Sequence, residues 1–482
     1  MQATGYDEGC SNKPMLLTRQ KKALLRKANP ADTFSALASG GQFFGWKRKG
    51  QTQLPWLSGA LIAALCVSLL VQPVWGYSVL THQQIIDLAW EPSIKPLLLS
   101  RYPNTTEAQL RLAQSYAYGG CEIQDAGYYP FGHVFFSNLT HYVRTGDFVA
   151  SLVRNARDVN ELAFALGALS HYIGDTIGHH DAINPSTAVE FPRLALQYGH
   201  SITYDESPHG HVRTEFAFDV DEMTKHHLAP AAYLDHIGLR VSLGLLERAF
   251  YETYGLHLRE VLGNKRRSAV IASYRHSVRS FLPAFAHAEA VIHQHDFPPE
   301  LDTPEFQALH ARIQQTGDLH QWQTMRRGPG ITTHLLAFLV ILIPKIGPAS
   351  DLAIKIPTQE TETSYVTSVN LTLRTFETHL QNLRTNRTDT PEIILNLENR
   401  DLDTGYVVQP GGYPRTDKTY AQLVSSLTRY PDRPVPSGLK RDILAYYSNP
   451  SSPIITKKDR KAWQRLQQEL ALLQTMPVVP LK

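Results

Sequence analysis

The chain has 482 residues, of which 43% are hydrophobic and 19% charged, so it can bury a sizeable core in two or three domains. Residues 1–76 hold nine of the 47 Lys and Arg and three of the 44 Asp and Glu, which leaves 38 basic and 41 acidic residues. This mildly acidic remainder argues against a general polyanion-binding surface, and the absence of repeats and low-complexity tracts argues against solenoid and disordered chains.

An apolar, uncharged run near the N-terminus, LSGALIAALCVSLLV, covers residues 57–71 and follows Lys47, Arg48 and Lys49. It has the length of a signal-peptide core and is shorter than the roughly 20 residues that span a bilayer. We therefore predict that residues 1–76 are a leader with a signal peptide, and that the mature chain is secreted or periplasmic. A membrane anchor at 57–71 is the alternative.

The chain contains three cysteines, Cys10, Cys66 and Cys121. Removal of the leader would leave only Cys121, so no intrachain disulfide could form. The spacing of these cysteines fits neither a zinc site nor a redox pair.

Apolar positions three and four residues apart recur along most of the remaining chain, whereas alternating strand patterns are scarce. Helices are predicted over 105–118, 147–157, 160–178, 229–254 and 268–294. The fold class is therefore expected to be mainly α.

Residues 296–482 are predicted to be a mainly helical C-terminal region of unknown role. The apolar run 335–343 ends at Pro344 and is interpreted as a buried helix, with a segment that contacts lipid as the alternative. The sequence DLDTGY contains Asp403, Thr404 and Gly405, which we interpret as a turn.

The segment LSHYIGDTIGHHDAINPS carries His171, Asp175 and His179 at intervals of four, which places them on one face of a helix. Two imidazoles and a carboxylate suit a divalent metal, zinc in particular. His211 and Glu215 repeat the spacing.

One helix cannot enclose several metal ions, so further ligands must come from separate segments. The candidates are His82, Asp125, His133 and His141.

The ordered motifs WGYSVLTH, QDAGYYPFG, LTHYVRTGD, LSHYIGDTIGHH and HVRTEFAFD resemble the zinc-dependent phospholipase C family. That family shares its helical fold and trinuclear zinc site with single-strand-specific nucleases. The resemblance implies a helical zinc-dependent phospholipase C/nuclease-like catalytic domain over residues 77–295, followed by the helical C-terminal extension 296–482.

The resemblance also implies three zinc ions per chain. The first would be held by Asp125, His141, His171 and Asp175. The second would be held by His179, His211 and Glu215. The third would be held by Tyr77, through the amine and carbonyl of a new N-terminus, together with His82 and Asp175.

Several of these assignments have alternatives. His180 is the alternative to His179, and His133 is the alternative to His141. Trp75 is the alternative to Tyr77 as the mature N-terminal residue.

The expected function is that of a secreted zinc-dependent phosphodiesterase, a phospholipase C-like hydrolase in which a zinc-bound hydroxide attacks phosphorus. Asp125 is the candidate catalytic residue that orients or deprotonates the water, and no organic cofactor is needed. The expected partners are a phospholipid or other phosphodiester substrate and, in peripheral contact, a membrane; no stable nucleic-acid partner is expected.

Two other functions compete with this one. A single-strand nuclease or nucleotidase would use aromatic platforms for bases, for which Tyr128, Tyr129 and Phe131 are candidates. A non-catalytic protein would use zinc only to hold its helices together.

Overall fold

A computed structural model describes residues 79–479 except 264–266, 317–318, 343–353 and 386–394. The leader 1–76, its apolar run 57–71 and Tyr77 lie outside the described residues. The described chain is mainly helical, which confirms the mainly α prediction. Its named strands are two short parallel segments, β1 (Val435–Pro436) and β2 (Val478–Val479).

The first half of the described chain contains α2 (Val79–Ala89), η1 (Trp90–Ile94), α3 (Lys95–Arg101), α4 (Glu107–Gly120), η2 (Ile123–Gly127), α5 (Val134–Tyr142), α6 (Thr145–Asn155), α7 (Val159–Gly178), η3 (His179–Ile183), α8 (Asn184–Glu190), α9 (Pro192–Tyr198), α10 (Pro208–Thr224), α11 (Ala231–Ile237) and α12 (Leu243–Tyr254). The second half contains α13 (Leu258–Leu262), α14 (Arg267–His276), η4 (Ser277–Phe281), α15 (Leu282–His293), α16 (Pro304–Gln314), α17 (Leu319–Met325), α18 (Ile331–Leu342), α19 (Gln359–Thr385), α20 (Pro414–Thr428), α21 (Ser437–Tyr446), η6 (Ile455–Lys458) and α22 (Arg460–Thr475).

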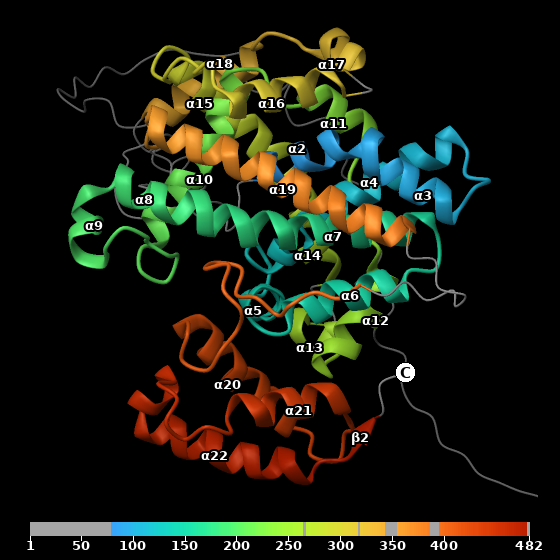
Figure 1. The fold of residues 1–482 in the computed structure, drawn as a ribbon, viewed down its shortest axis with the longest axis vertical. Helices are drawn as coiled ribbons and strands as arrows, with labels where there is room; N and C mark the ends of the chain where they lie inside the picture. Colours follow the sequence, from blue (N-terminus) through green and yellow to red (C-terminus); the bar gives the residue numbers. More distant parts are fainter. Residues whose placement is uncertain (1–78, 264–266, 317–318, 343–353, 386–394, 480–482) are drawn as a thin grey trace, which may run out of the picture. The chain divides into compact units, whose positions relative to one another are not determined.

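Helices α4 and α7 pack directly on each other and form the centre of the structure (Figure 1). A Cβ atom on Gly120 would lie 2.0 Å from the carbonyl oxygen of Phe164, and one on Gly167 would lie 2.2 Å from that of Ala117. The two glycines therefore let the helix backbones touch, as small residues do at close helix crossings.

Local sequence signals explain where these two helices begin. The Asp158 carboxylate accepts hydrogen bonds from the amides of Asn160 and Glu161 at the start of α7. Thr106 and Gln109 form a reciprocal capping box at the start of α4. The predicted ranges 105–118 and 160–178 are therefore close to the observed helices.

The predicted helix over 229–254 is wrong in its middle. Residues 238–242 separate α11 from α12, and Gly238 has a φ of 82°, which only glycine adopts readily. In contrast, the predicted helix over 268–294 runs through α14, the π-helical turn η4 and α15.

The apolar run 335–343 begins within α18, and its interpretation as a buried helix is wrong for one face. Ala337 and Val340 are buried, but Leu335 and Phe338 are each 56% exposed and Ile341 is 62% exposed. The helix packs on α15 with its other face. Among the described residues, no helix has the length and hydropathy needed to cross a membrane.

Residues beyond the predicted boundary at 295/296 pack on the elements before it. Helix α19 contacts α7, and α20 contacts α5. The Tyr365 hydroxyl on α19 lies 2.9 Å from the Thr81 hydroxyl on α2. The C-terminal region therefore supports the helices of the N-terminal one.

Candidate metal centre

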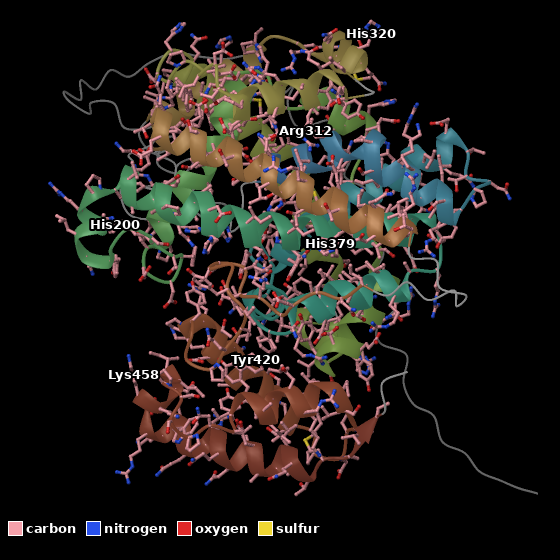
Figure 2. The ribbon with its side chains drawn as sticks, in the orientation of Figure 1. His200, Arg312, His320, His379, Tyr420 and Lys458 are labelled. Atoms are coloured by element: carbon pink, nitrogen blue, oxygen red, sulfur yellow. The ribbon has the colours of Figure 1, made fainter. Side chains whose placement is uncertain are left out.

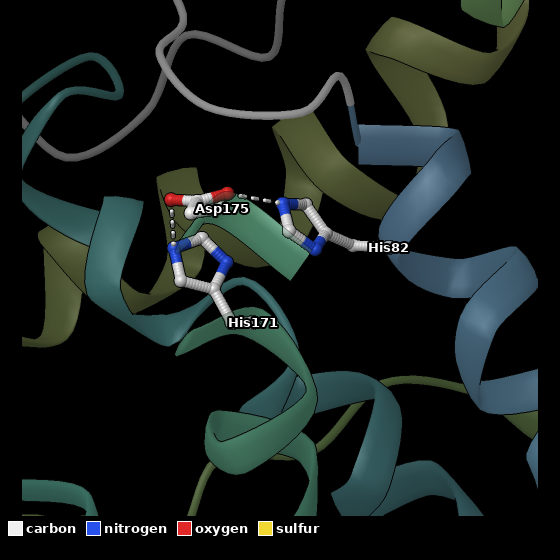
Figure 3. Close-up of side chains that lie close together, drawn as sticks. All are labelled: His82, His171 and Asp175. Atoms are coloured by element: carbon white, nitrogen blue, oxygen red, sulfur yellow. Dashed lines mark ion pairs between the residues drawn. The ribbon is translucent and has the colours of Figure 1, made fainter. Parts of the chain in front are cut away.

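Asp175 on α7 lies between two histidines from different helices (Figure 3). Its Oδ1 is 3.1 Å from His82 Nε2 on α2, and its Oδ2 is 3.1 Å from His171 Nε2 on α7. All three side chains are fully buried. Their ligand atoms are close enough to surround one metal ion.

A second group shares His171 with the first. Asp125, on the 3-10 turn η2, places Oδ1 at 3.1 Å from His141 Nε2, and the Nε2 atoms of His141 and His171 are 3.4 Å apart. His141 Nε2 also lies 3.5 Å from Asp175 Oδ2. Asp175 therefore contacts members of both groups.

The third group lies where α7 passes into the π-helical turn η3. His179 Nε2 is 3.3 Å from Glu215 Oε1, and His211 Nε2 is 2.6 Å from the same oxygen. Both His211 and Glu215 belong to α10, which begins with Pro208 after its N-cap Ser207. The spacing of four residues thus places both side chains on one face, as expected.

The alternative histidines lie outside these groups. His180 is exposed and is 2.6 Å from the carboxylate of Asp181. His133 is exposed at the N-cap of α5. The structure therefore brings together the described members of the predicted ligand set (His82, Asp125, His141, His171, Asp175, His179, His211 and Glu215). Their role as zinc ligands stays a prediction.

Backbone carbonyls orient three of the imidazoles. His171 Nδ1 lies 2.9 Å from the oxygen of Cys121, His141 Nδ1 lies 2.8 Å from that of Ser137, and His179 Nδ1 lies 2.7 Å from that of Leu402. Because a carbonyl only accepts, each Nδ1 carries the proton and each Nε2 presents its lone pair to the group. Metal-binding histidines are held in this way.

Asp219 is a residue that the sequence interpretation missed. Its Oδ2 accepts a hydrogen bond from the Leu80 amide at 2.8 Å, and its Oδ1 accepts one from the Thr81 amide at 3.0 Å. These amides lie in the first turn of α2, where a carboxylate is favourable. Asp219 therefore fixes the helix that carries His82. Its spacing of four from Glu215 was an available signal.

The sequence interpretation missed the role of the turn at 402–404 at the metal centre. The turn confirms the one predicted for DLDTGY and supplies the Leu402 carbonyl that orients His179. The Leu402 amide donates to the carbonyl of His141 at 3.0 Å, and the Asp403 carboxylate accepts from the Tyr142 hydroxyl at 2.9 Å. No side-chain motif could reveal Leu402, because its backbone makes these bonds.

The donor set fits zinc. The carboxylate oxygens of Asp125 and Asp175 and Oε1 of Glu215 are buried, and they accept no well-directed hydrogen bond from the described residues. Leaving such atoms unpartnered is costly unless a cation is present. Imidazole nitrogens with carboxylate oxygens are the ligands that zinc prefers outside cysteine sites.

Without a metal, protons would balance these charges. Burial alone would lower the pKa of His141, but Asp125 and Asp175 raise it well above its usual value. Burial raises the pKa of Glu215 to about 8 and lowers the pKa of His211 to about 4. Metal binding at these groups should therefore release protons.

Residues 81–264 match the family model described as zinc dependent phospholipase C. This range contains every described member of the three groups. Comparison with curated proteins and with solved structures gives no significant match.

Proposed function

We propose that this protein is a phosphodiesterase that releases the phosphorylated head group of a phospholipid, because residues 81–264 match the zinc dependent phospholipase C family model. The observation that carries the proposal is the set of three buried His/carboxylate groups, two of which share His171. Buried imidazole and carboxylate ligands of this kind suit metal-assisted hydrolysis more than a purely structural role.

The proposal includes three zinc ions, one for each group. Asp175 would help to hold the ion at His82 and the ion at Asp125, His141 and His171, because it contacts members of both groups. The ion at His82 would be completed by the amine of Tyr77, if the leader is removed after Gly76. Removal of the leader would also make the enzyme secreted or periplasmic.

Zinc at these groups would neutralise charge on the phosphate and lower the pKa of a nearby water to about 7. Asp125 would hold that water for attack on phosphorus and take its proton on Oδ2, which accepts no well-directed hydrogen bond from the described residues. A new bond would form from the water oxygen to phosphorus while the bond from phosphorus to the glycerol oxygen breaks, and the glycerol oxygen would take up a proton from solvent and leave as diacylglycerol. The Ser137 and Cys121 carbonyls would hold His141 and His171 in place during this step.

The burial of two tyrosines favours lipid over nucleic acid as substrate. Tyr128 and Tyr129 are only 3% and 2% exposed, so neither offers a face to a nucleic-acid base. Of the three candidate aromatic residues, Phe131 alone is exposed, at 72%.

The exposed apolar face of α18, formed by Ile331, Leu335, Phe338, Leu339, Ile341 and Leu342, suits peripheral contact with a phospholipid surface. The twelve residues of α18 include no Asp, Glu, Lys or Arg.

The test is hydrolysis of phosphatidylcholine vesicles, of p-nitrophenyl phosphorylcholine and of single-stranded DNA by the mature protein, with zinc per chain measured on the same preparation. We expect about three zinc ions at the three groups within residues 81–264, and release of phosphocholine from both choline esters. Cleavage of DNA alone would establish the nuclease alternative. Full zinc occupancy without hydrolysis of any ester would establish the non-catalytic alternative.

A further inference from the structure

A fourth group of metal-ligand side chains lies outside the centre described above. It comprises His227, Glu300 and His310, whose ligand atoms lie within 4.8 Å of one another. His227 follows the C-terminal end of α10, Glu300 lies between α15 and α16, and His310 belongs to α16. Glu300 and His310 fall beyond the residues that match the family.

The ligand atoms of three side chains meet at close range in this group. His227 Nε2 is 2.9 Å from Glu300 Oε1, and His310 Nε2 is 3.0 Å from Glu300 Oε2. The two Nε2 atoms are 3.2 Å apart. Zinc bonds of about 2.0–2.1 Å in a tetrahedron separate neighbouring ligand atoms by about 3.3 Å, so the group has the dimensions of a metal site.

The orientation of His227 is set from its other side. Its Nδ1 lies 3.2 Å from Oε1 of Glu222, and Oε2 of Glu222 accepts a hydrogen bond from the Gln84 side chain at 2.7 Å. His226 has a left-handed backbone, with φ of 63°, and the His227 amide donates to the Glu222 carbonyl at 3.0 Å. A carboxylate on Nδ1 leaves Nε2 directed at Glu300, as in carboxylate–histidine–zinc arrangements.

The two imidazoles crowd each other if protons alone hold this group together. Each Nε2 faces a different oxygen of Glu300, but the two Nε2 atoms are only 3.2 Å apart, so two N–H groups would lie side by side. Glu300 Oε1 is buried, yet it accepts no well-directed hydrogen bond among the described residues, although His227 Nε2 is 2.9 Å away. A cation between the three side chains would accept the lone pairs of both Nε2 atoms and offset the charge of the carboxylate.

The charge around the group also favours a cation. Glu222 and Glu300 are both acidic, and Lys225, which lies near both, is itself paired with Asp221 and Glu362. Two neutral imidazoles beside two carboxylates would balance a divalent ion. The Glu300 and His310 side chains are 26% and 43% exposed, so an ion can reach the group from solvent.

We propose that His227, Glu300 and His310 form a further zinc site that fastens α16 and the segment before it to the end of α10. Three protein ligands leave a position for water. The ligands come from a helix end, a connecting segment and a second helix, so the bound ion would cross-link parts of the chain that are separated by more than 70 residues. This site is independent of the proposed hydrolysis.

The test compares zinc per chain in the wild type, His310→Ala and Glu300→Gln at equal free zinc. The matched control is His320→Ala, because His320 is an exposed histidine on the nearby α17, labelled in Figure 2. We expect each ligand variant to bind one zinc ion fewer per chain than the wild type and the control.

A second measurement is the thermal unfolding temperature with and without added zinc. We expect zinc to raise it less in His310→Ala and Glu300→Gln than in the control, with hydrolysis retained within twofold. Equal zinc counts in all four proteins would overturn the proposal and establish a purely protonic His–Glu network. Because the readout is bound zinc, the result stands even if no phosphate ester is cleaved.

Discussion

The central groups and the His227–Glu300–His310 group have the same types of ligand side chain. They differ in which atoms orient the histidines and in how deeply the ligands are buried. In the centre, the imidazoles of His141, His171 and His179 are oriented by backbone carbonyls and are almost completely buried. In the outer group, a carboxylate side chain orients His227, and the other two ligands are partly exposed. Buried backbone carbonyls move little, so we expect zinc bound as proposed to stay longer in the centre than in the outer group.

Replacing Asp175 by Asn should have the largest effect, because Asp175 contacts His82, His171 and His141. Metal ions supply several kcal/mol of transition-state stabilisation, so hydrolysis should fall by roughly 1,000-fold. Asn preserves the volume of the side chain, and circular dichroism would check the fold. Steady-state kinetics and zinc content measure the effect, and activity within tenfold of the wild type would contradict the central role of Asp175.

Replacing Gly405 by Ala should disturb the metal centre indirectly, by displacing the backbone that orients His179. Gly405 has a φ of 73°, and an added Cβ would lie 2.4 Å from the carbonyl oxygen of Thr176 on α7. The turn at 402–404 would have to shift and move the Leu402 carbonyl away from His179, at a cost of about 1–3 kcal/mol. Chemical denaturation and activity measure both consequences.

The matched control for this prediction is Gly199→Ala. Gly199 also has a positive φ, 98°, but an added Cβ would meet nothing within 4 Å. Equal losses in the two variants would show that backbone strain, and not the contact with α7, explains the effect.

Slow removal of metal should show directly that the two regions lose zinc at different rates. With a chelator in excess, the outer group should lose zinc first, because its ligands are partly exposed, and the central groups should follow. We expect hydrolysis to persist through the first phase and to disappear in the second. Zinc release and activity would be followed in parallel; loss of activity in step with the first ion released would reverse the assignment.

A smaller effect is expected at α18, which contains ligands of neither region. Replacing Leu335 and Phe338 by Ser should reduce hydrolysis of phospholipid vesicles several-fold by removing apolar contact with the lipid surface. Hydrolysis of soluble p-nitrophenyl phosphorylcholine should not change. Leu196→Ser is the control, because Leu196 lies on α9, outside this apolar face, and is 90% exposed. Equal losses on both substrates would place the effect in the fold and not at the membrane.

The two regions also differ in how far sequence could predict them. His171, Asp175 and His179 are spaced four residues apart, as on one face of a helix. The other residues of the central groups are predicted from the separate motifs that resemble the family. His227, Glu300 and His310 have no common spacing, because they come from the segment after α10, the segment before α16 and α16 itself. Sequence could not reveal the Leu402 carbonyl, which any residue could provide.

The wrong interpretation of α18 has a related physical reason. Hydropathy reports what a side chain prefers, and burial depends on which neighbours the fold supplies. Ala337 and Val340 are buried against other parts of the protein, whereas Leu335 and Phe338 remain exposed.

The glycine contact between α4 and α7 also bears on how the protein is assembled. The Cys121 carbonyl that holds His171 follows Gly120 directly, so the backbone contact at Gly120 and Gly167 sets its position. The contact involves protein backbone alone, so it would position His171 without help from a metal ion. We therefore expect the protein prepared without zinc to keep its α4–α7 pair and to bind added zinc without refolding.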